Sequence, residues 1–250
     1  MVSESANDRT VLRIGGSDRV EFLQGLVTND VSHLADGLVY AALLSPQGKY
    51  LADFFLVQGD DAILLDVKTD LARALTKRLT LYRLRADVQI EETDIKVTRG
   101  LRDGPKGSIA DPRHPALGWR FYGDTSVSEN VDWDALRVEH CIPETGVELI
   151  PDETYVLEAG FERLNGVDFR KGCYVGQEVV ARMKHKTELR KGLARVTVRG
   201  AAPVRTPILA EGKPAGTLFT QSGEHGIAHL RFDRAAGPMS ADQAVVELQM

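Results

Sequence analysis

The sequence predicts an α+β protein in which a region of antiparallel sheet and helices is followed by a small β-barrel. Two observations support this prediction. Strand-like and helix-like segments alternate, with adjacent hairpins, up to about residue 189. From Gly192 on, short β-rich pieces are separated by Gly and Pro turns, which is typical of a small barrel or sandwich. We therefore expect two regions, residues 9–189 and 190–250.

The first region opens with a strand, a helix and a hairpin. "TVLRIGG" (10–16) is typical of a strand closed by a Gly-Gly turn. "SDRVEFLQGLVTND" (17–30) is typical of a helix with Ser17 as its N-cap. The apolar runs 38–45 and 50–58 flank a Pro-x-Gly turn and predict a hairpin.

The pattern then continues with a strand at 62–67 and a helix at 69–84, whose leucines recur at helical spacing. Two further strands are expected at 86–93 and 95–100. The Gly- and Pro-rich residues 103–118 predict a loop.

A short helix is expected at 131–141, whereas "EVVARM" (178–183) fits a strand or a helix. The expected strands of the barrel lie within residues 193–200, 206–212, 214–221 and 226–232.

The composition is that of a globular protein with a mild acidic excess. Its 43% hydrophobic residues suffice for a sizeable core, and the net charge of −5 argues against a surface dedicated to nucleic acid. With only Cys141 and Cys173, neither a disulfide scaffold nor a Cys-x-x-Cys metal site is predicted. The polar start "MVSESANDRT" and the lack of an apolar run of ~18 residues predict a cytoplasmic protein with no membrane span.

The most unusual stretch is "RKGCYVGQEVV" (170–180). Gly172 and Gly176 flank Cys173, and glycines permit positive φ and a close approach to the backbone. The cations of Arg170 and Lys171 would favour the thiolate of the cysteine. An inert cysteine in a tight turn fits the same residues, so they leave both interpretations open.

Residues 171–178, "KGCYVGQE", resemble the signature of the YgfZ family of folate-binding proteins, whose eukaryotic relatives are mitochondrial iron–sulfur assembly factors. "FLQGLVTNDV" (22–31) and "LLSPQGKYLADFFLV" (43–57) are similar to that family and to its larger relative, the glycine-cleavage T-protein. "LYRLRADVQI" (81–90) and "GIAHLR" (226–231) extend the likeness over most of residues 10 to 235.

The resemblance implies a T-protein-like core and a C-terminal barrel around a central folate channel. It implies a tetrahydrofolate-binding accessory protein for the assembly or repair of iron–sulfur enzymes, with folate and iron–sulfur proteins or their assembly machinery as partners. Membrane and nucleic-acid partners are not expected. The alternative is a folate-dependent aminomethyltransferase or demethylase of the T-protein class, so whether the chain is an enzyme stays open.

The resemblance also assigns site residues. Cys173 matches the signature cysteine and is the candidate functional thiol. Glu158, in "VLEAG", matches the acid that binds the pterin ring in the relatives. The chemistry fits this role, because a carboxylate accepts two parallel hydrogen bonds from an amino-pyrimidine edge. The remaining signature positions are candidate folate contacts: Lys171, Tyr174, Gly176, Gln177 and Glu178.

Asp53 is a further candidate, because the T-protein carries two adjacent acids where this chain has Ala52 and Asp53. The loss of one acid fits a non-transferase, while Asp53 keeps the enzyme alternative open. A solvent-facing strand position is the other interpretation of Asp53.

Residues 181–192, "ARMKHKTELRKG", form a local basic cluster that includes Arg182 and Lys186. Such a cluster could hold the glutamate tail of folate, although an ordinary solvated loop fits equally well. His225 and His229 would lie about 13 Å apart on a strand, so we expect no shared metal ion and two unrelated surface or core histidines.

Overall fold

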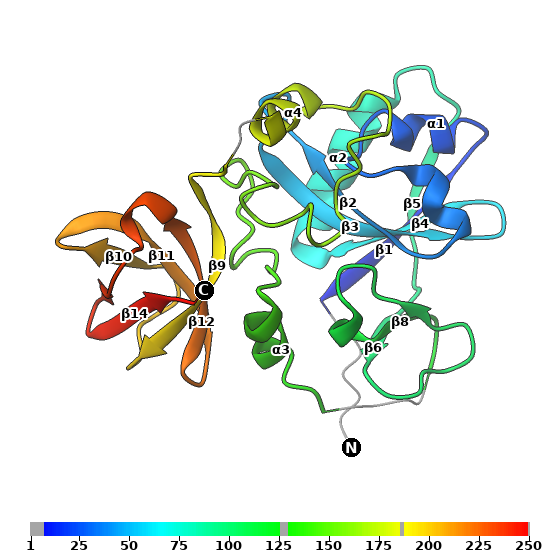
Figure 1. Ribbon diagram of the computed structural model, residues 1–250. Helices are drawn as coiled ribbons and strands as arrows, with labels where there is room; N and C mark the ends of the chain where they lie inside the picture. Colours follow the sequence, from blue (N-terminus) through cyan, green and yellow to red (C-terminus); the bar gives the residue numbers. More distant parts are fainter. Residues whose placement is uncertain (1–7, 126–129, 186–187, 250) are drawn as a thin grey trace. The chain divides into compact units, whose positions relative to one another are not determined.

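The computed structural model describes residues 8–125, 130–185 and 188–249 (Figure 1). The chain divides into two compact units. The first comprises residues 1–131 and 162–179, and the second comprises 132–161 and 180–250. This division differs from the expected one at residue 189, because helix α3 (Trp133–His140) and the segment up to Phe161 group with the barrel. Among the described residues, no helix is both long and apolar enough to cross a bilayer.

The first unit is built on a five-stranded antiparallel sheet in the order β2-β3-β4-β1-β5. Its strands are β1 (Arg9–Gly15), β2 (Val39–Leu44), β3 (Tyr50–Gln58), β4 (Ile63–Lys68) and β5 (Gln89–Glu92). Strand β3 is buried on both faces, with Phe54 and Phe55 almost inaccessible to water. The sheet therefore has two covered sides, which differ in chemistry.

One side of the sheet is an apolar core. Leu12, Val39 and Phe54 pack there with Leu75 and Leu79 of helix α2 (Thr69–Arg83). The short helix α1 (Arg19–Gln24) and the 3₁₀ helix η1 (Val31–Ala35) contribute to the same cluster. The expected hairpin, third strand and long helix are thus present.

The other side carries Tyr40, Asp53, Phe55 and Asp66, which the strand register places on one face. A second, three-stranded sheet in the order β6-β8-β7 supplies Arg120 to this face, where its Nη1 atom donates to Asp66 Oδ2. Its strands are β6 (Val97–Gly100), β7 (Ile109–Ala110) and β8 (Trp119–Tyr122). The predicted loop at 103–118 therefore contains β7 and the 3₁₀ helix η2 (Pro115–Leu117), and β8 was not predicted.

The predicted helix 17–30 was wrong in its length and in its N-cap. Helix α1 ends at Gln24, because Val27 pairs with Leu43 and the Thr28 N–H donates to Ala42 O at 3.0 Å. Pairing with strand β2 thus overrides the helical periodicity of these residues. Ser17 does not cap the helix, since its hydroxyl donates to Asp87 Oδ2 at 3.0 Å.

The second unit contains a closed six-stranded barrel in the order β10-β11-β12-β9-β14-β13, which confirms the predicted C-terminal barrel. Its strands are β9 (Lys191–Arg199), β10 (Thr206–Ala210), β11 (Lys213–Ser222), β12 (His225–Arg231), β13 (Met239–Ala241) and β14 (Ala244–Leu248), and the 3₁₀ helix η3 spans Phe232–Arg234. The barrel interior is apolar, with Val196, Leu218 and Val246 fully buried.

Helix α3 (Trp133–His140) attaches to the barrel through one buried ion pair. Arg137 Nη1 lies 3.0 Å from Glu148 Oε2, and the Arg137 Nη2 group donates to the Thr220 hydroxyl at 2.9 Å. Glu148 Oε1 in turn accepts from Thr220 at 2.5 Å. The ambiguous segment 178–183 is helical, within α4 (Gln177–His185).

Candidate functional site

The signature loop is anchored to the first unit by Lys171. Its ammonium group donates to the carbonyl oxygens of Gln24 at 2.8 Å, Val27 at 2.6 Å and Asn29 at 2.9 Å. These three acceptors lie at the end of α1 and in the turn that follows it. The Lys171 side chain is buried and lies 5.1 Å from the centre of the Tyr174 ring. All three N–H donors of the Lys171 ammonium group are thus occupied by backbone carbonyl groups of the protein.

Burial lowers the pKa of Lys171 to about 8, against the opposing attraction of Asp30 and Asp168. The group is therefore mostly an ammonium ion at neutral pH, which is the form that three carbonyl acceptors require. Burial also raises the pKa of Tyr174 to about 12, so this phenol stays neutral.

Gly176 lets the loop turn onto the hairpin. It has φ +83°, and a Cβ atom at this position would come within 2.7 Å of the Ser45 carbonyl oxygen. In the same place, a Cβ atom on Gly48 would lie 2.6 Å from the Val179 Cβ atom. The start of α4 therefore sits directly on the β2–β3 turn.

Cys173 is a free, exposed thiol between these anchors. Lys171 and Tyr174, on either side of Gly172 and Cys173, are both buried. Gln177 Nε2 donates to Gly172 O at a long 3.4 Å, while Glu178 is exposed in the first turn of α4. The cysteine is thus presented to solvent by a loop whose neighbours are fixed, and it is not a buried cysteine packed as a small hydrophobe.

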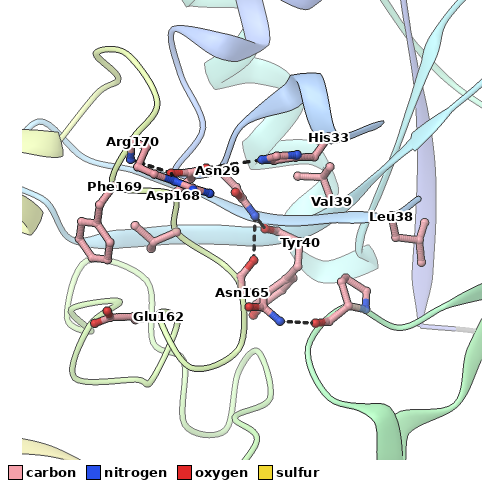
Figure 2. Close-up of a pocket in the computed structure, with 12 residues that line it drawn as sticks. Asn29, His33, Leu38, Val39, Tyr40, Glu162, Asn165, Asp168, Phe169 and Arg170 are labelled. Carbon is pink, nitrogen blue, oxygen red and sulfur yellow. Dashed lines mark hydrogen bonds and ion pairs between the residues drawn. The ribbon is translucent and has the colours of Figure 1, made fainter. Parts of the chain in front are cut away.

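A cavity of about 560 Å³ opens beside the signature loop within the first unit (Figure 2). Leu38, Val39 and Val167 give it an apolar part. Asn29 and Asn165 join its walls, because Asn29 Nδ2 donates to Asn165 O at 2.7 Å and Asn165 Nδ2 donates to Pro112 O at 2.8 Å. Its remaining lining residues are His33, Tyr40, Pro112, Glu162, Asp168, Phe169 and Arg170.

His33 lies at the edge of this cavity, close to two carboxylates. Its Nε2 atom is 3.5 Å from Asp168 Oδ2, and the potential metal-ligating atoms of Asp30, His33 and Asp168 lie within 4.8 Å of one another. The hydrogen bonds from Ser32 lower the pKa of Asp30. Burial alone would raise the pKa of Asp168, but the Arg170 N–H and guanidinium outweigh it and lower that pKa.

Asp53 is buried in the first unit, so the solvent-facing interpretation is wrong. Tyr50 donates to its Oδ1 atom at 2.7 Å, and Tyr40 donates to Oδ2 at 3.0 Å. Burial and the neighbouring Asp53 charge raise the pKa of Tyr40 well above its usual value. Both carboxylate oxygens of Asp53 therefore already have donors from the sheet.

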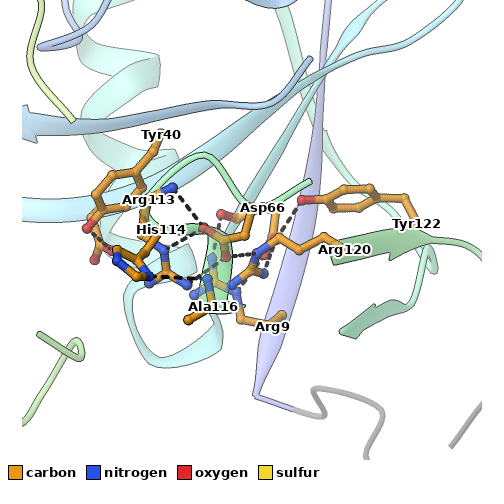
Figure 3. A network of polar contacts seen from close by, with 10 residues as sticks. Arg9, Tyr40, Asp66, Arg113, His114, Ala116, Arg120 and Tyr122 are labelled. Carbon is orange, nitrogen blue, oxygen red and sulfur yellow. Dashed lines mark hydrogen bonds and ion pairs between the residues drawn. The ribbon is translucent and has the colours of Figure 1, made fainter. Parts of the chain in front are cut away.

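Next to Asp53 lies a dense network of buried ion pairs (Figure 3). Asp66 Oδ1 is 2.6 Å from Arg9 Nε, and Asp66 Oδ2 is 3.0 Å from Arg120 Nη1 and 2.9 Å from the Tyr122 hydroxyl. Arg120 also contacts Asp111, which makes a two-bond pair with Arg113.

The guanidinium groups of this network also stack on an aromatic ring. The Arg120 Cζ atom lies 3.8 Å from the centre of the Phe55 ring and the Arg113 Cζ atom lies 4.9 Å from it. The network thus covers the face of the sheet that carries Asp53.

In the second unit, Glu158 pairs with His229. The His229 Nε2 atom lies 3.0 Å from Glu158 Oε2, and neither side chain is fully buried. Glu158 also fixes the first barrel strand, because its carbonyl oxygen accepts from Leu193 N at 2.7 Å. His229, which was expected to be an unrelated surface or core histidine, is thus the partner of Glu158.

A cavity of about 700 Å³ lies over Glu158 within the second unit. Its other lining residues are Met183, His185, Glu188, Leu189, Arg190 and Lys191. Part of the predicted basic cluster thus lies around the Glu158 carboxylate, together with a second acid, Glu188. Arg182 is exposed on α4 and does not line this cavity, and Lys186 lies outside the described residues.

The candidate residues therefore form three groups. Cys173, Lys171, Tyr174, Gly176, Gln177 and Glu178 lie together on the signature loop and the start of α4. Asp53 belongs to the sheet of the same unit, whereas Glu158 and Arg182 belong to the second unit. Sequence reasoning missed Tyr40 and Tyr50 as partners of Asp53. Their positions in the hairpin, at register with the aspartate face, were the available signal.

Comparison with known proteins agrees with this architecture. Residues 190–250 match the family model of the CAF17 C-terminal beta-barrel domain. The human iron–sulfur cluster assembly factor IBA57 is 30% identical over an alignment that covers 92% of this chain and 78% of the human protein.

The chain belongs to the IBA57 family.

The mouse iron–sulfur cluster assembly factor IBA57 is 28% identical, with the same coverage of 92% and 78%. Among solved structures, the aminomethyltransferase T of the glycine cleavage system from Bartonella henselae superposes with a TM-score of 0.76 over 98% of this chain and 84% of that chain. At 14% identity this likeness shows the fold alone, and it confirms the predicted T-protein-like α+β architecture.

Membership of the IBA57 family corrects one expectation and refines another. The cytoplasmic location is overturned, because the human, mouse and Mycosarcoma maydis relatives are all named as mitochondrial proteins. The resemblance to iron–sulfur assembly factors is confirmed, and the relatives carry the name IBA57 rather than YgfZ.

Proposed function

We propose that this protein is an iron–sulfur cluster assembly factor that binds a tetrahydrofolate at Glu158. Its membership of a family whose curated members are named iron–sulfur cluster assembly factors supports the first part. Its partners are then iron–sulfur proteins or their assembly machinery, and we infer the mitochondrial location of the relatives for this chain.

The observation that carries the folate proposal is the cavity over Glu158. Its volume of about 700 Å³ is within the usual range for small-molecule sites. A carboxylate has about four lone-pair positions, so the bond from His229 leaves acceptors for the two N–H groups of a pterin edge. The lining cations Arg190 and Lys191 suit the negative glutamate tail.

Within this proposal, His229 has a positioning role. Its imidazole holds one oxygen of Glu158, which leaves the other oxygen free to face the cavity. Met183 and Leu189 supply apolar surface for a flat ring. The bound tetrahydrofolate would supply one-carbon chemistry. Lys171, Tyr174, Gly176, Gln177, Glu178 and Arg182 stay predicted folate contacts; of these, Lys171 has its donors already in use.

The position of Asp53 gives little support to a transferase role. Its two oxygens accept hydrogen bonds from Tyr40 and Tyr50, and the side chain is only 5% exposed. A catalytic carboxylate must reach its substrate, so we favour an accessory protein over a one-carbon transferase.

Calorimetric titration with reduced tetrahydrofolate tests the binding. We expect saturable binding that Glu158→Gln weakens about tenfold, which corresponds to about 1.4 kcal/mol. Glu224→Gln, an exposed glutamate of the β11–β12 turn, is the matched control and should bind normally. No binding by the unaltered protein would refute the folate part.

The assembly role needs a separate measurement. Cells depleted of this protein should lose activity in iron–sulfur enzymes, and the unaltered chain should restore it. Fractionation of the restored cells, which contain the unaltered chain, would check the mitochondrial location. Full iron–sulfur enzyme activity after depletion would count against an assembly function.

A further inference from the structure

The solvent side of α2 and the turn after it carry an unusual set of exposed residues. Leu81 is 69% exposed and Leu84 is 86% exposed, although both are large and apolar. Exposed cations surround them along the same stretch. We define the α2 basic face as Arg73, Lys77, Arg78, Leu81, Leu84 and Arg85.

The spacing puts these residues on one surface. Positions 73 and 77, and then 77 and 81, are four apart, and 78 and 81 are three apart; such residues are neighbours on a helix. Leu84 and Arg85 follow directly in the turn after the helix end at Arg83. The opposite stripe, Ala72, Leu75 and Leu79, is buried in the core of the first unit. The α2 basic face is therefore the outer side of a helix whose inner side is already covered.

The charges of this face are not used within the described part of the protein. Arg73, Lys77, Arg78 and Arg85 form no ion pair there, whereas Arg13, Lys68 and Lys96 each pair with an acid nearby. Asp70 is the single acid of α2, in its first turn. This concentration of positive charge contrasts with the net charge of −5 for the whole chain.

Leu84 is held outward by a strained and well-anchored turn. Its backbone has φ +46° and ψ −104°, which is unfavourable for a residue with a branched side chain. Arg83 Nη1 donates to Val88 O at 3.2 Å, and Asp87 N donates to Asp18 Oδ2 at 2.8 Å. Ser17 N adds a bond to Asp87 Oδ2 at 3.0 Å. The exposed leucine is thus presented by a fixed backbone.

We propose that the α2 basic face docks a partner protein through an acidic surface that has a shallow apolar spot for Leu81 and Leu84. Long-range attraction would steer the acidic surface to the four cations, and the two leucines would add apolar burial at the centre. The helix of 15 residues is about 22 Å long, which suits one side of a protein–protein contact.

A protein fits this face better than a membrane does. An amphipathic helix that binds lipid inserts a wide apolar face, but the apolar stripe of α2 is occupied by the core. Two exposed leucines remain, and the cations of the α2 basic face run from Arg73 past the end of the helix to Arg85. A single-stranded nucleic acid would also call for aromatic side chains among the charges, and the α2 basic face has none.

The proposal is tested with a photo-crosslinking residue at Thr80, which is exposed beside Leu81 and Leu84 and leaves both in place. The full chain replaces the cellular copy, and crosslinked peptides are sequenced. The same crosslinker at Val245, on β14, reports random neighbours. We expect one predominant protein adduct at Thr80, absent at Val245, whose crosslinked segment is rich in Asp and Glu.

Charge reversal then tests the cause. Arg78→Glu with Arg85→Glu should reduce the adduct about tenfold, as expected for the loss of complementary charge. Lys106→Glu with Lys213→Glu, also exposed cations, is the matched control and should leave the adduct unchanged. Thermal unfolding of both double variants checks that they fold.

Three outcomes would overturn the proposal: no adduct above that at Val245, an adduct that survives reversal, or a lipid adduct. Sedimentation of the purified protein with vesicles of equal phosphatidylcholine and phosphatidylglycerol checks the lipid case directly. The proposal is independent of folate. Tetrahydrofolate titration of the Arg78→Glu, Arg85→Glu protein should match the unaltered protein, so that failure of either idea is recognised separately.

Discussion

The two units of this protein cover their strands in opposite ways. The first unit buries Asp53, Asp66 and Asp111 with Arg9, Arg113 and Arg120 against one face of its sheet. The barrel of the second unit encloses an apolar interior of Val, Leu, Ile, Ala and Met side chains. A buried ion pair of the second unit, Arg137 with Glu148, joins α3 to the barrel through Thr220 of β11.

This difference predicts that the two units respond differently to single substitutions. Apolar burial stabilises in proportion to the area removed from water, and it tolerates exchange of similar side chains. A buried ion network contributes little net stability, but the loss of one member leaves the others charged and unpaired. We therefore expect the first unit to be the more sensitive to single polar changes. Trp119 and Trp133, one in each unit, allow unfolding to be followed separately.

The largest effect is expected for Asp66→Ala. The change leaves Arg9 and Arg120 without their shared carboxylate in a site with no exposure, which should cost about 3–5 kcal/mol of unfolding free energy. Denaturant unfolding followed at Trp119, in a Trp133→Phe background, measures it. Asp61→Ala, whose pair with Arg13 is exposed, is the control and should cost about 0–1 kcal/mol. A loss below that of Asp61→Ala would contradict the comparison.

Next in size is a cavity in the barrel. Leu218→Ala removes a fully buried side chain from the apolar interior and should cost about 2–5 kcal/mol. The loss should register at Trp133 in a Trp119→Phe background. Leu218→Met should cost less than about 1.5 kcal/mol, because it conserves volume. An equally large loss with methionine would contradict the comparison, because the barrel interior would then tolerate substitution as poorly as the ion network does.

A smaller effect is expected on the unfolding free energy of the first unit at low pH. Burial acts to raise the pKa of Asp111, but Arg113 and Arg120 outweigh it and lower the pKa to about 2, from 3.8. A lowered folded-state pKa gives stability that is present above the unfolded value and is lost as pH falls from about 4 toward 2. The contribution is about 2 kcal/mol. The pH dependence of unfolding at Trp119 should become flatter in this range in Asp111→Asn, and an unchanged slope would exclude this origin.

The smallest effect on stability is expected for Cys173→Ser. The thiol is exposed, so unfolding free energy should change by less than about 0.5 kcal/mol. Function should nevertheless fall, since we predict that this thiol acts in the assembly role. Restoration of iron–sulfur enzyme activity in depleted cells is the measurement, with Cys141→Ser as its control. Full restoration by Cys173→Ser would show that the loop serves without its thiol.

The sequence predicted the apolar elements well and the polar layer poorly. The hairpin, helix α2 and four of the six barrel strands follow from local periodicity and turn residues, whereas β13 and β14 were not predicted. Asp53 was ambiguous, because a charged residue on a strand is buried or exposed according to what covers the sheet. The cover comes from residues 111–122, far along the chain, and local pattern does not reveal it.

The candidate site shows the same limit. The signature 171–178 and Glu158 came from the family resemblance, and the structure placed them. The resemblance alone did not predict that the Lys171 ammonium group donates to three carbonyl groups, or that His229 pairs with Glu158. Each of these contacts joins residues more than 70 positions apart, so no spacing in the chain signals them.

The three bonds of Lys171 also bear on biosynthesis. The carbonyl groups of Gln24, Val27 and Asn29 leave the ribosome long before Lys171, which follows them by 142 to 147 residues. They can accept the ammonium only after α1 has ended and the following turn has formed. Cys173 therefore reaches its fixed place only in a chain whose N-terminal part has already folded, and incomplete or misfolded chains would not offer the thiol to a partner in this form.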